Sequence, residues 1–136
     1  MQYNESPRPL DQAEREWHIL VVDDEDMFLN ALKRMLERFG YRVTAFTGGP
    51  EALEAFEAAP ESFDLVISDR AMPRMSGEQL VRKILSIRPD VPILFITGLA
   101  DPAFHAAARA LGAREVILKP VSTSDLTRIV GEALPA

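Results

Sequence analysis

The stretch Ile19-Leu20-Val21-Val22-Asp23-Asp24 decides the fold, because a short apolar run ends abruptly in two acidic residues. Three later apolar runs also end in a polar residue: Leu65-Val66-Ile67-Ser68 before Asp69, Ile93-Leu94-Phe95-Ile96 before Thr97, and Val116-Ile117-Leu118 before Lys119. Short runs that are apolar throughout are typical of strands buried on both faces, as in parallel sheets. The pattern therefore predicts a sheet with acids, a hydroxyl and an ammonium at the end where ligands bind.

Segments of helical periodicity separate these strands, and most have recognisable ends. Gly40 and Gly112 suit left-handed helix stops, Gly49-Pro50 and Asp101-Pro102 suit helix starts, and Pro60 closes the second helix. Ser76 with Gln79, and Ser122 with Asp125, have the spacing of helix caps. The residues expected to face the core are Phe28, Leu32, Met35, Leu36, Phe39, Leu53, Phe56, Ala59, Leu80, Ile84, Ile87, Leu126, Ile129, Val130 and Leu134.

The order strand–helix, repeated five times, predicts a single flavodoxin-like, doubly wound α/β domain with five parallel strands and five helices. The second strand, residues 41–46, mixes apolar and polar residues, as an edge strand does. This favours the strand order 2-1-3-4-5, in which the switch point lies between strands one and three. Asp23, Asp24 and Asp69 should therefore meet there.

Length and composition narrow the class of protein. The 136 residues suit one domain, which we expect at 17–136 after a polar, flexible leader at 1–16. No apolar stretch can span a bilayer, and no apolar signal-like segment precedes the domain, which favours a cytoplasmic location. The absence of cysteine excludes disulfides and thiolate metal sites. A net charge of −6 without a basic run argues against direct nucleic-acid binding.

The predicted cluster of carboxylates indicates phosphoryl chemistry. Neighbouring carboxylates repel one another unless a cation offsets them, and Mg²⁺ suits a site with a few carboxylates and a phosphate. Lys119 adds a second positive charge and Thr97 a hydroxyl. Asp69 stands alone at its strand end and is the expected nucleophile, while the adjacent Asp23 and Asp24 are suited to holding the metal.

With these residues, the chain resembles the receiver domain of bacterial two-component response regulators. The matching motifs are Val21-Val22-Asp23-Asp24-Glu25, Ser68-Asp69 with Met72-Pro73 and Gly77, Ile96-Thr97-Gly98, Leu111-Gly112-Ala113 and Lys119-Pro120. Each motif alone is weak, but together, in this order and spacing, they are highly specific. The resemblance covers nearly the whole chain from Trp17.

The resemblance implies a role for each site residue. Asp69 would take a phosphoryl group from a phosphohistidine on a histidine kinase or histidine phosphotransfer protein. Asp23, Asp24, Asp69 and the backbone carbonyl of Arg70 would surround Mg²⁺. Lys119 would pair with the phosphoryl oxygens, Thr97 would move to hydrogen-bond them, and the Lys119-Pro120 bond would be cis.

The chain departs from the family pattern at three positions. Val116 stands where an aromatic switch residue is common, so coupling to Thr97 must be transmitted differently. Ala71 and Leu99, at positions that often tune dephosphorylation, are both apolar and cannot orient an attacking water. We therefore expect slow self-dephosphorylation from a module that is not a conventional enzyme.

Alternative interpretations remain open at the level of sequence. The run Asp23-Asp24-Glu25-Asp26 can simply stabilise a helix start, since acids suit that end of a helix. Asp24-Glu25-Asp26 also superficially fits a magnesium-dependent phosphatase of the haloacid-dehalogenase kind, with Asp24 as nucleophile. A third alternative is a non-phosphorylated pseudo-receiver that serves as a scaffold.

The sequence fits two cellular contexts. The chain suits either a stand-alone regulator or the receiver segment of a hybrid sensor kinase, with an unknown downstream protein and homodimerisation as an option. The usual output face of the family would here present Arg109, Arg114, Glu115 and Arg128.

Overall fold

The computed structural model describes residues 16–135, in which five parallel strands form one sheet in the order β2-β1-β3-β4-β5. The strands are β1 (His18–Val22), β2 (Arg42–Phe46), β3 (Leu65–Asp69), β4 (Ile93–Thr97) and β5 (Glu115–Leu118). The predicted strand order is therefore confirmed. The predicted leader lies outside the described residues, apart from Glu16.

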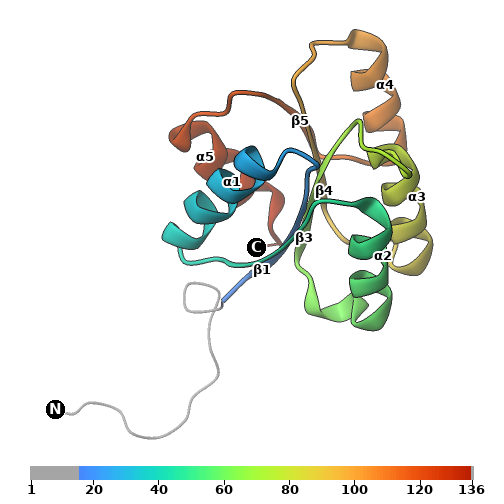
Figure 1. The fold of residues 1–136 in the computed structure, drawn as a ribbon, viewed down its shortest axis with the longest axis horizontal. Helices are drawn as coiled ribbons and strands as arrows, with labels where there is room; N and C mark the ends of the chain where they lie inside the picture. The colour runs from blue at the N-terminus through green and yellow to red at the C-terminus, as the bar shows by residue number, and fades with distance from the viewer. Residues whose placement is uncertain (1–15, 136) are drawn as a thin grey trace, which may run out of the picture.

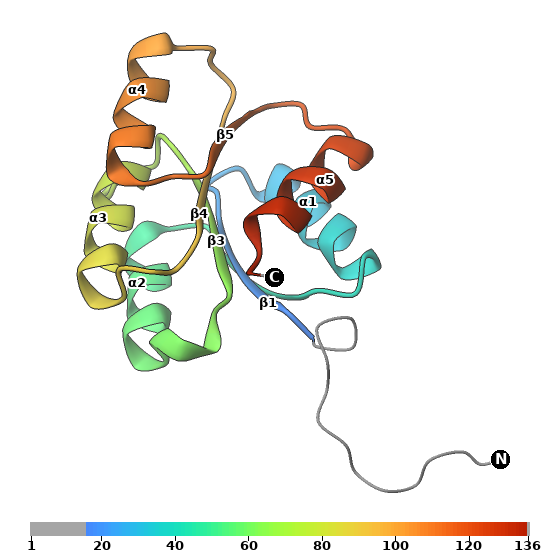
Figure 2. The ribbon, with the colours of Figure 1, turned by 180° about the vertical axis from the view of Figure 1, so that it is seen from behind.

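Helices cover both faces of this sheet. They are α1 (Asp26–Arg38), α2 (Gly49–Ala58), α3 (Gly77–Ile87), α4 (Pro102–Leu111) and α5 (Thr123–Ala133), with a 3₁₀ turn η1 (Pro60–Ser62) before β3. Figures 1 and 2 show α1 and α5 on one face and α2, α3 and α4 on the other. Two separate apolar clusters correspond to these faces. Among the described residues, no helix is long and apolar enough to cross a membrane.

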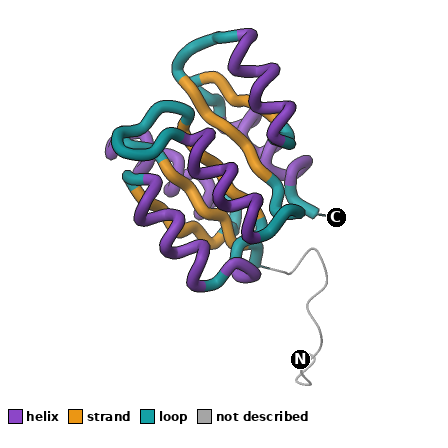
Figure 3. Tube along the Cα trace, turned by 90° about the vertical axis from the view of Figure 1, so that its right-hand side faces the viewer, coloured by secondary structure: helices purple, strands orange, loops and turns teal. Residues whose placement is uncertain are grey.

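The strand register brings the strand ends together. Val22 pairs with Ser68, Asp69 with Ile96, and Thr97 with Leu118, so the polar residue that ends each apolar run lies at the same end of the sheet. The strands β1, β3 and β4 are buried throughout, whereas the edge strand β2 is only half-buried. Figure 3 shows the helices lying over the sheet and running roughly along the strands, with loops joining them at both ends.

The predicted helix ends are mostly confirmed. Gly40 and Gly112 have left-handed φ angles of 93° and 104° after α1 and α4. Ser76 and Gln79 form a reciprocal capping box at α3, and the side chains of Asp101 and Ser122 accept backbone N–H groups at the starts of α4 and α5. Local sequence is sufficient here because each cap involves residues at most three positions apart.

Two predicted core residues are wrong. Ala59 follows the last residue of α2 and is exposed, while Ala52 is buried beside Phe56 in its place. Ile87 is 39% exposed, because the buried stripe of α3 runs through Leu80, Val81 and Ile84. Arg88 follows Ile87 directly. Its guanidinium donates to the carbonyls of Pro60 and Phe63 and so links the end of α3 to the segment before β3.

Candidate functional site

The loops that follow β1, β3, β4 and β5 line an open cavity of about 430 Å³. Its lining residues are Asp24, Glu25, Asp69, Ala71, Thr97, Gly98, Leu99 and Lys119. Four of the predicted site residues, Asp24, Asp69, Thr97 and Lys119, thus border one space although up to 95 positions separate them along the chain. The parallel strands achieve this because their carboxyl ends all lie at one edge of the sheet.

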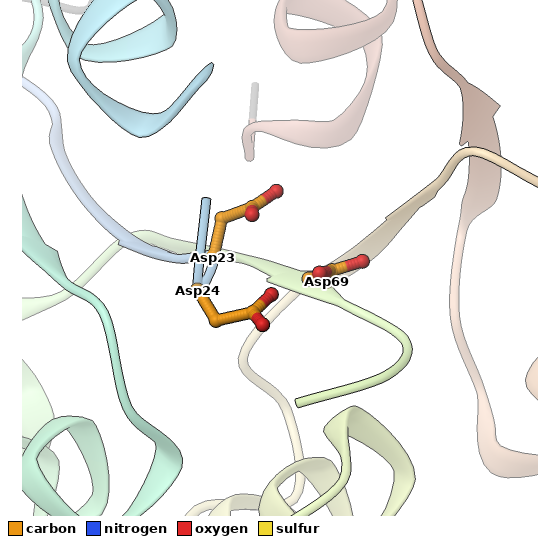
Figure 4. A group of neighbouring side chains, drawn as sticks. All are labelled: Asp23, Asp24 and Asp69. Atoms are coloured by element: carbon orange, nitrogen blue, oxygen red, sulfur yellow. The ribbon is translucent and has the colours of Figure 1, made fainter. Parts of the chain in front are cut away.

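Three aspartates form the acidic part of the cavity. One carboxylate oxygen from each of Asp23, Asp24 and Asp69 lies within 4.8 Å of the others, and Figure 4 shows the three side chains converging between the ends of β1 and β3. Asp23 is fully buried and Asp69 is 6% exposed, whereas Asp24 faces solvent. The predicted meeting of these acids at the switch point is confirmed.

Backbone amides hold two of these carboxylates in place. The N–H of Glu25 donates to Asp23 Oδ1 at 2.9 Å, and the N–H of Arg70 donates to Asp69 Oδ1 at 2.8 Å. The second oxygen of Asp23 is buried and accepts no hydrogen bond. Lys119 Nζ lies 2.9 Å from that oxygen, which makes an ion pair although the geometry is not that of a hydrogen bond.

Burial and like charge raise the pKa of Asp69 from 3.8 to about 7. Burial of the carboxyl is the largest cause, the charge of Asp23 adds to it, and the positive charge of Lys119 opposes it. Without a further cation, the site therefore favours a protonated Asp69 in acidic and neutral solution.

The donor set fits a magnesium ion. Three carboxylate oxygens within one ion's reach and an Asp69 whose ionised form is disfavoured are features that a hard divalent cation would relieve. An exposed Asp24 on the open side leaves room for water ligands, which Mg²⁺ keeps.

The Lys119 ammonium lies beside the carboxylates, at the start of α1. Its Nζ lies 2.9 Å from Asp23 Oδ2 and 2.6 Å from Glu25 Oε1, and it sits 4.4 Å from the centre of the Phe28 ring. Burial alone would lower the pKa of Lys119, but the contacts with Glu25 and Asp23 outweigh it and raise the pKa above its usual value. The residue is therefore a fixed cation beside the carboxylates, and its peptide bond to Pro120 is cis, as predicted.

Thr97 ends β4 at the rim of the cavity. The residue is 4% exposed, and its Oγ1 accepts the N–H of Leu99 at 3.2 Å. Leu99 itself is 66% exposed and Ala71 is also exposed, so the two apolar residues line the cavity without covering it. Val116, which stands where receiver domains commonly have an aromatic switch residue, is half-buried on β5.

The Arg70 carbonyl, which was predicted as a metal ligand, lies in the loop that joins β3 to α3. It accepts the N–H of Gly77 at 2.8 Å, and Arg70 does not line the cavity, whereas Ala71 does. The Arg70 side chain turns away to Asp101, at 2.9 Å, and to the Phe104 ring, at 4.4 Å. A carbonyl that accepts one N–H keeps a second lone pair, so the Arg70 carbonyl as a metal ligand stays a prediction.

The structure gives Gly77 a clear physical role. A Cβ atom at this position would lie 2.0 Å from the backbone oxygen of Asp69, far inside contact distance. Only glycine lets the start of α3 approach the acceptor strand this closely. The sequence contained Gly77 as part of a motif, but a clash with a residue eight positions away is visible only in three dimensions.

Comparison with known proteins agrees with this geometry. The sequence model of the response regulator receiver domain matches residues 19–131. The response regulator receiver protein CpdR of Brucella abortus is 36% identical over 118 residues, which cover 87% of this chain and 97% of that protein. The sensor kinase CckA of the same organism is 35% identical over 116 residues, 85% of this chain but only 12% of the kinase.

Solved structures agree as well. A response regulator receiver domain protein from Clostridium thermocellum superposes with a TM-score of 0.82 at 35% identity, covering 86% of this chain and 93% of that one. Among the sequence relatives, CpdR is spanned almost completely, whereas this chain spans less than half the length of the seven others compared. On the matched family model, the relatives and the fold, this chain belongs to the response regulator receiver domain family.

Proposed function

We propose that Asp69 is the phosphoacceptor of this receiver domain and takes its phosphoryl group from a phosphohistidine. A carboxylate oxygen of Asp69 attacks phosphorus, the phosphorus–nitrogen bond breaks, and the histidine nitrogen leaves with the bonding electrons and gains a proton. The observation that carries the proposal is the position of Asp69 in a cavity that it shares with Asp24 and Lys119, with Asp23 adjoining. An acyl phosphate on a carboxylate is an established covalent strategy.

The other side chains take roles that follow from their charge. Asp23, Asp24 and Asp69 would hold Mg²⁺, with the backbone carbonyl of Arg70, or that of the neighbouring Ala71, as a further ligand. When bound, the ion offsets the carboxylate charge and that of the entering phosphoryl group. Lys119 would pair with phosphoryl oxygens and Thr97 would donate its hydroxyl to one, turning from the N–H of Leu99.

The direct test is covalent labelling. The protein is incubated with Mg²⁺ and acetyl phosphate, and phosphoryl gain is read from the intact mass. The site is then mapped in a second sample, in which borohydride reduces the acyl phosphate, phosphate leaves, and the labelled aspartate is converted to homoserine. We expect one phosphoryl group at Asp69, none in an Asp69→Asn variant, and none when Mg²⁺ is removed by chelation. A label on Asp24 would instead support the haloacid-dehalogenase alternative, and no label at all would leave the pseudo-receiver scaffold.

We also propose that the acyl phosphate is hydrolysed slowly. Ala71 and Leu99 line the cavity and neither carries a group that can orient water. Replacing them, in Ala71→Asn and Leu99→Glu, should shorten the phosphoryl lifetime, which is followed by loss of label after removal of the donor. An unchanged lifetime in both variants would contradict this proposal.

Membership of the family suggests the class of phosphoryl donor and the cellular setting. Receiver domains work with histidine kinases or phosphotransfer proteins, and we propose such a partner here, in the cytoplasm, with this segment acting alone or within a longer kinase. Arg109, Arg114, Glu115 and Arg128 are exposed around α4, β5 and α5 and form the proposed output face. Purified candidate kinases, compared for transfer rate, would identify the donor.

A further inference from the structure

Glu25 occupies the N-cap position of α1, yet its side chain does not cap the helix. Its carboxylate instead reaches across the site, where Oε1 lies 2.6 Å from Nζ of Lys119, a residue 94 positions away. Its backbone N–H meanwhile donates to Asp23 Oδ1. The acid that follows the aspartate pair is thus directed at the only lysine of the cavity lining, and the simple capping interpretation does not account for it.

The three contacts of Lys119 differ in how firmly they are held. Asp23 is fully buried at the end of β1, and Phe28 is half-buried on α1, so both are held by packing. The Glu25 side chain is 64% exposed and lines the open cavity. Glu25 is therefore the contact that can be exchanged when a phosphoryl oxygen approaches the Lys119 ammonium.

The negative charge of Glu25 indicates that its contact with Lys119 opposes phosphoryl transfer. Glu25 adds a fourth carboxylate to a site that already holds Asp23, Asp24 and Asp69, and its pair with Lys119 offsets the cation that a phosphoryl group needs. An anionic phosphodonor meets both the extra repulsion and the competition for Lys119.

We propose that Glu25 is a positioning residue that draws the Lys119 ammonium to the start of α1 and thereby slows phosphoryl transfer to Asp69. The proposal rests on the phosphoacceptor function proposed above. Because Glu25 is largely exposed, its ion pair is a weak one, and removal of its charge should accelerate phosphoryl gain about two- to fivefold.

The test compares variants that separate charge from contact. Glu25→Gln keeps an oxygen able to accept from Lys119 but removes the charge, and Glu25→Ala removes both. Phosphoryl gain is measured by intact mass over a series of acetyl phosphate concentrations at constant Mg²⁺. Both variants should react faster, with most of the change in the half-saturating donor concentration, and the advantage should shrink as added salt screens the charge.

A matched control is available one residue along. Asp26→Asn removes a negative charge from the first turn of α1, where Asp26 is exposed, without touching an ion pair of Lys119. Its rate should change less than about 1.5-fold, because solvent and salt screen a charge outside the contact. Urea unfolding of all variants reports any loss of fold separately.

Three results would overturn the proposal. If Glu25→Gln reacts at the wild-type rate or more slowly while the wild type is labelled at Asp69, Glu25 does not restrain Lys119 and the phosphoacceptor function stands alone. If Glu25→Ala reacts more slowly, Glu25 assists rather than restrains. If the wild-type protein gains no label at Asp69, both proposals fall together.

Discussion

The two ends of the central sheet both bury polar side chains, but they treat them differently. At the amino end, His18 is 5% exposed and Asp64 is 7% exposed. The His18 ring nitrogens contact the carbonyl of Ser62 at 2.9 Å and the hydroxyl of Thr44 at 2.7 Å, and the His18 N–H donates to Asp64 Oδ2. Every one of these contacts pairs a donor with an acceptor.

At the carboxyl end, the buried groups oppose one another. The oxygens of Asp23, Asp24 and Asp69 converge, with the Lys119 ammonium beside one oxygen of Asp23. The pKa of Asp69 is raised to about 7 by burial and by the charge of Asp23. Buried polar groups that are fully paired stabilise a fold, whereas like charges gathered in a cleft are typical of a functional site. The paired polar groups at the amino end therefore stabilise the fold, whereas the like charges at the carboxyl end destabilise it and form the candidate site.

The largest expected effect comes from closing the space beside Asp69. Gly77→Ala would place a Cβ 2.0 Å from the Asp69 backbone oxygen, so the start of α3 or the end of β3 must move. We expect a loss of about 3 kcal/mol of stability in urea unfolding, at the upper end of overpacking costs. The Asp69 label should be lost with it.

Gly131→Ala is the matched control for this clash. Gly131 lies within α5, and a Cβ there meets nothing within 4 Å. The same chemical change should stabilise by about 0.5–1 kcal/mol, because alanine favours helix over glycine. Equal effects at the two positions would contradict the close-approach role of Gly77.

At the amino end, His18→Ala should destabilise by about 2–3 kcal/mol. The change removes both ring contacts and the packing of the ring on Phe63, whose centroid is 4.5 Å away, and leaves partners without a hydrogen bond. Thr44→Ser, which keeps the hydroxyl, should cost much less. A loss below about 0.5 kcal/mol for His18→Ala would remove the contrast between the two ends.

At the carboxyl end, Asp69→Asn should stabilise the metal-free protein by about 1–3 kcal/mol at pH 8. Because the folded pKa of about 7 exceeds the ordinary 3.8, the folded state binds more protons between these values. The Asp69 contribution is fully present below pH 3.8 and is lost as pH rises through 7. The variant's advantage should therefore disappear near pH 4, as measured by urea unfolding in chelator at each pH.

Mg²⁺ should reduce the stability difference between the wild type and Asp69→Asn by stabilising the wild type. The ion stabilises the state that binds it, so added Mg²⁺ should raise the melting temperature of the wild type more than that of Asp69→Asn. Equal shifts in the two proteins would mean that Asp69 does not contribute to binding of the ion.

The smallest effect is the pH response of the amino end. Burial lowers the pKa of His18 below its ordinary 6.5, although the bond to Ser62 and the charge of Asp64 work in the other direction. Between the lowered pKa and 6.5 the unfolded state binds more protons, so stability should fall as pH drops below 6.5. His18→Gln should lack this component, and parallel pH curves for the two proteins would contradict it.

Much of this protein could be predicted from sequence because the relevant signals are local. Continuous apolar runs identified the buried strands, and residues three positions apart identified the caps of α3 and α5. The site followed from one topological rule, since parallel strands end at one edge and the residue after each run must lie there. Asp23, Asp24, Asp69, Thr97 and Lys119 were found in this way.

Tertiary structure decided what depends on approach between distant segments. The contact of Glu25 with Lys119 spans 94 positions, the fit of Gly77 against Asp69 depends on how α3 meets β3, and the N–H of Gly77 donates to the Arg70 carbonyl across the loop between them. Exposure of Ala59 and Ile87 likewise depends on where each helix leaves the sheet. Residue types and spacing along a chain set which groups can react, whereas distances of a few ångströms between segments set which of them meet.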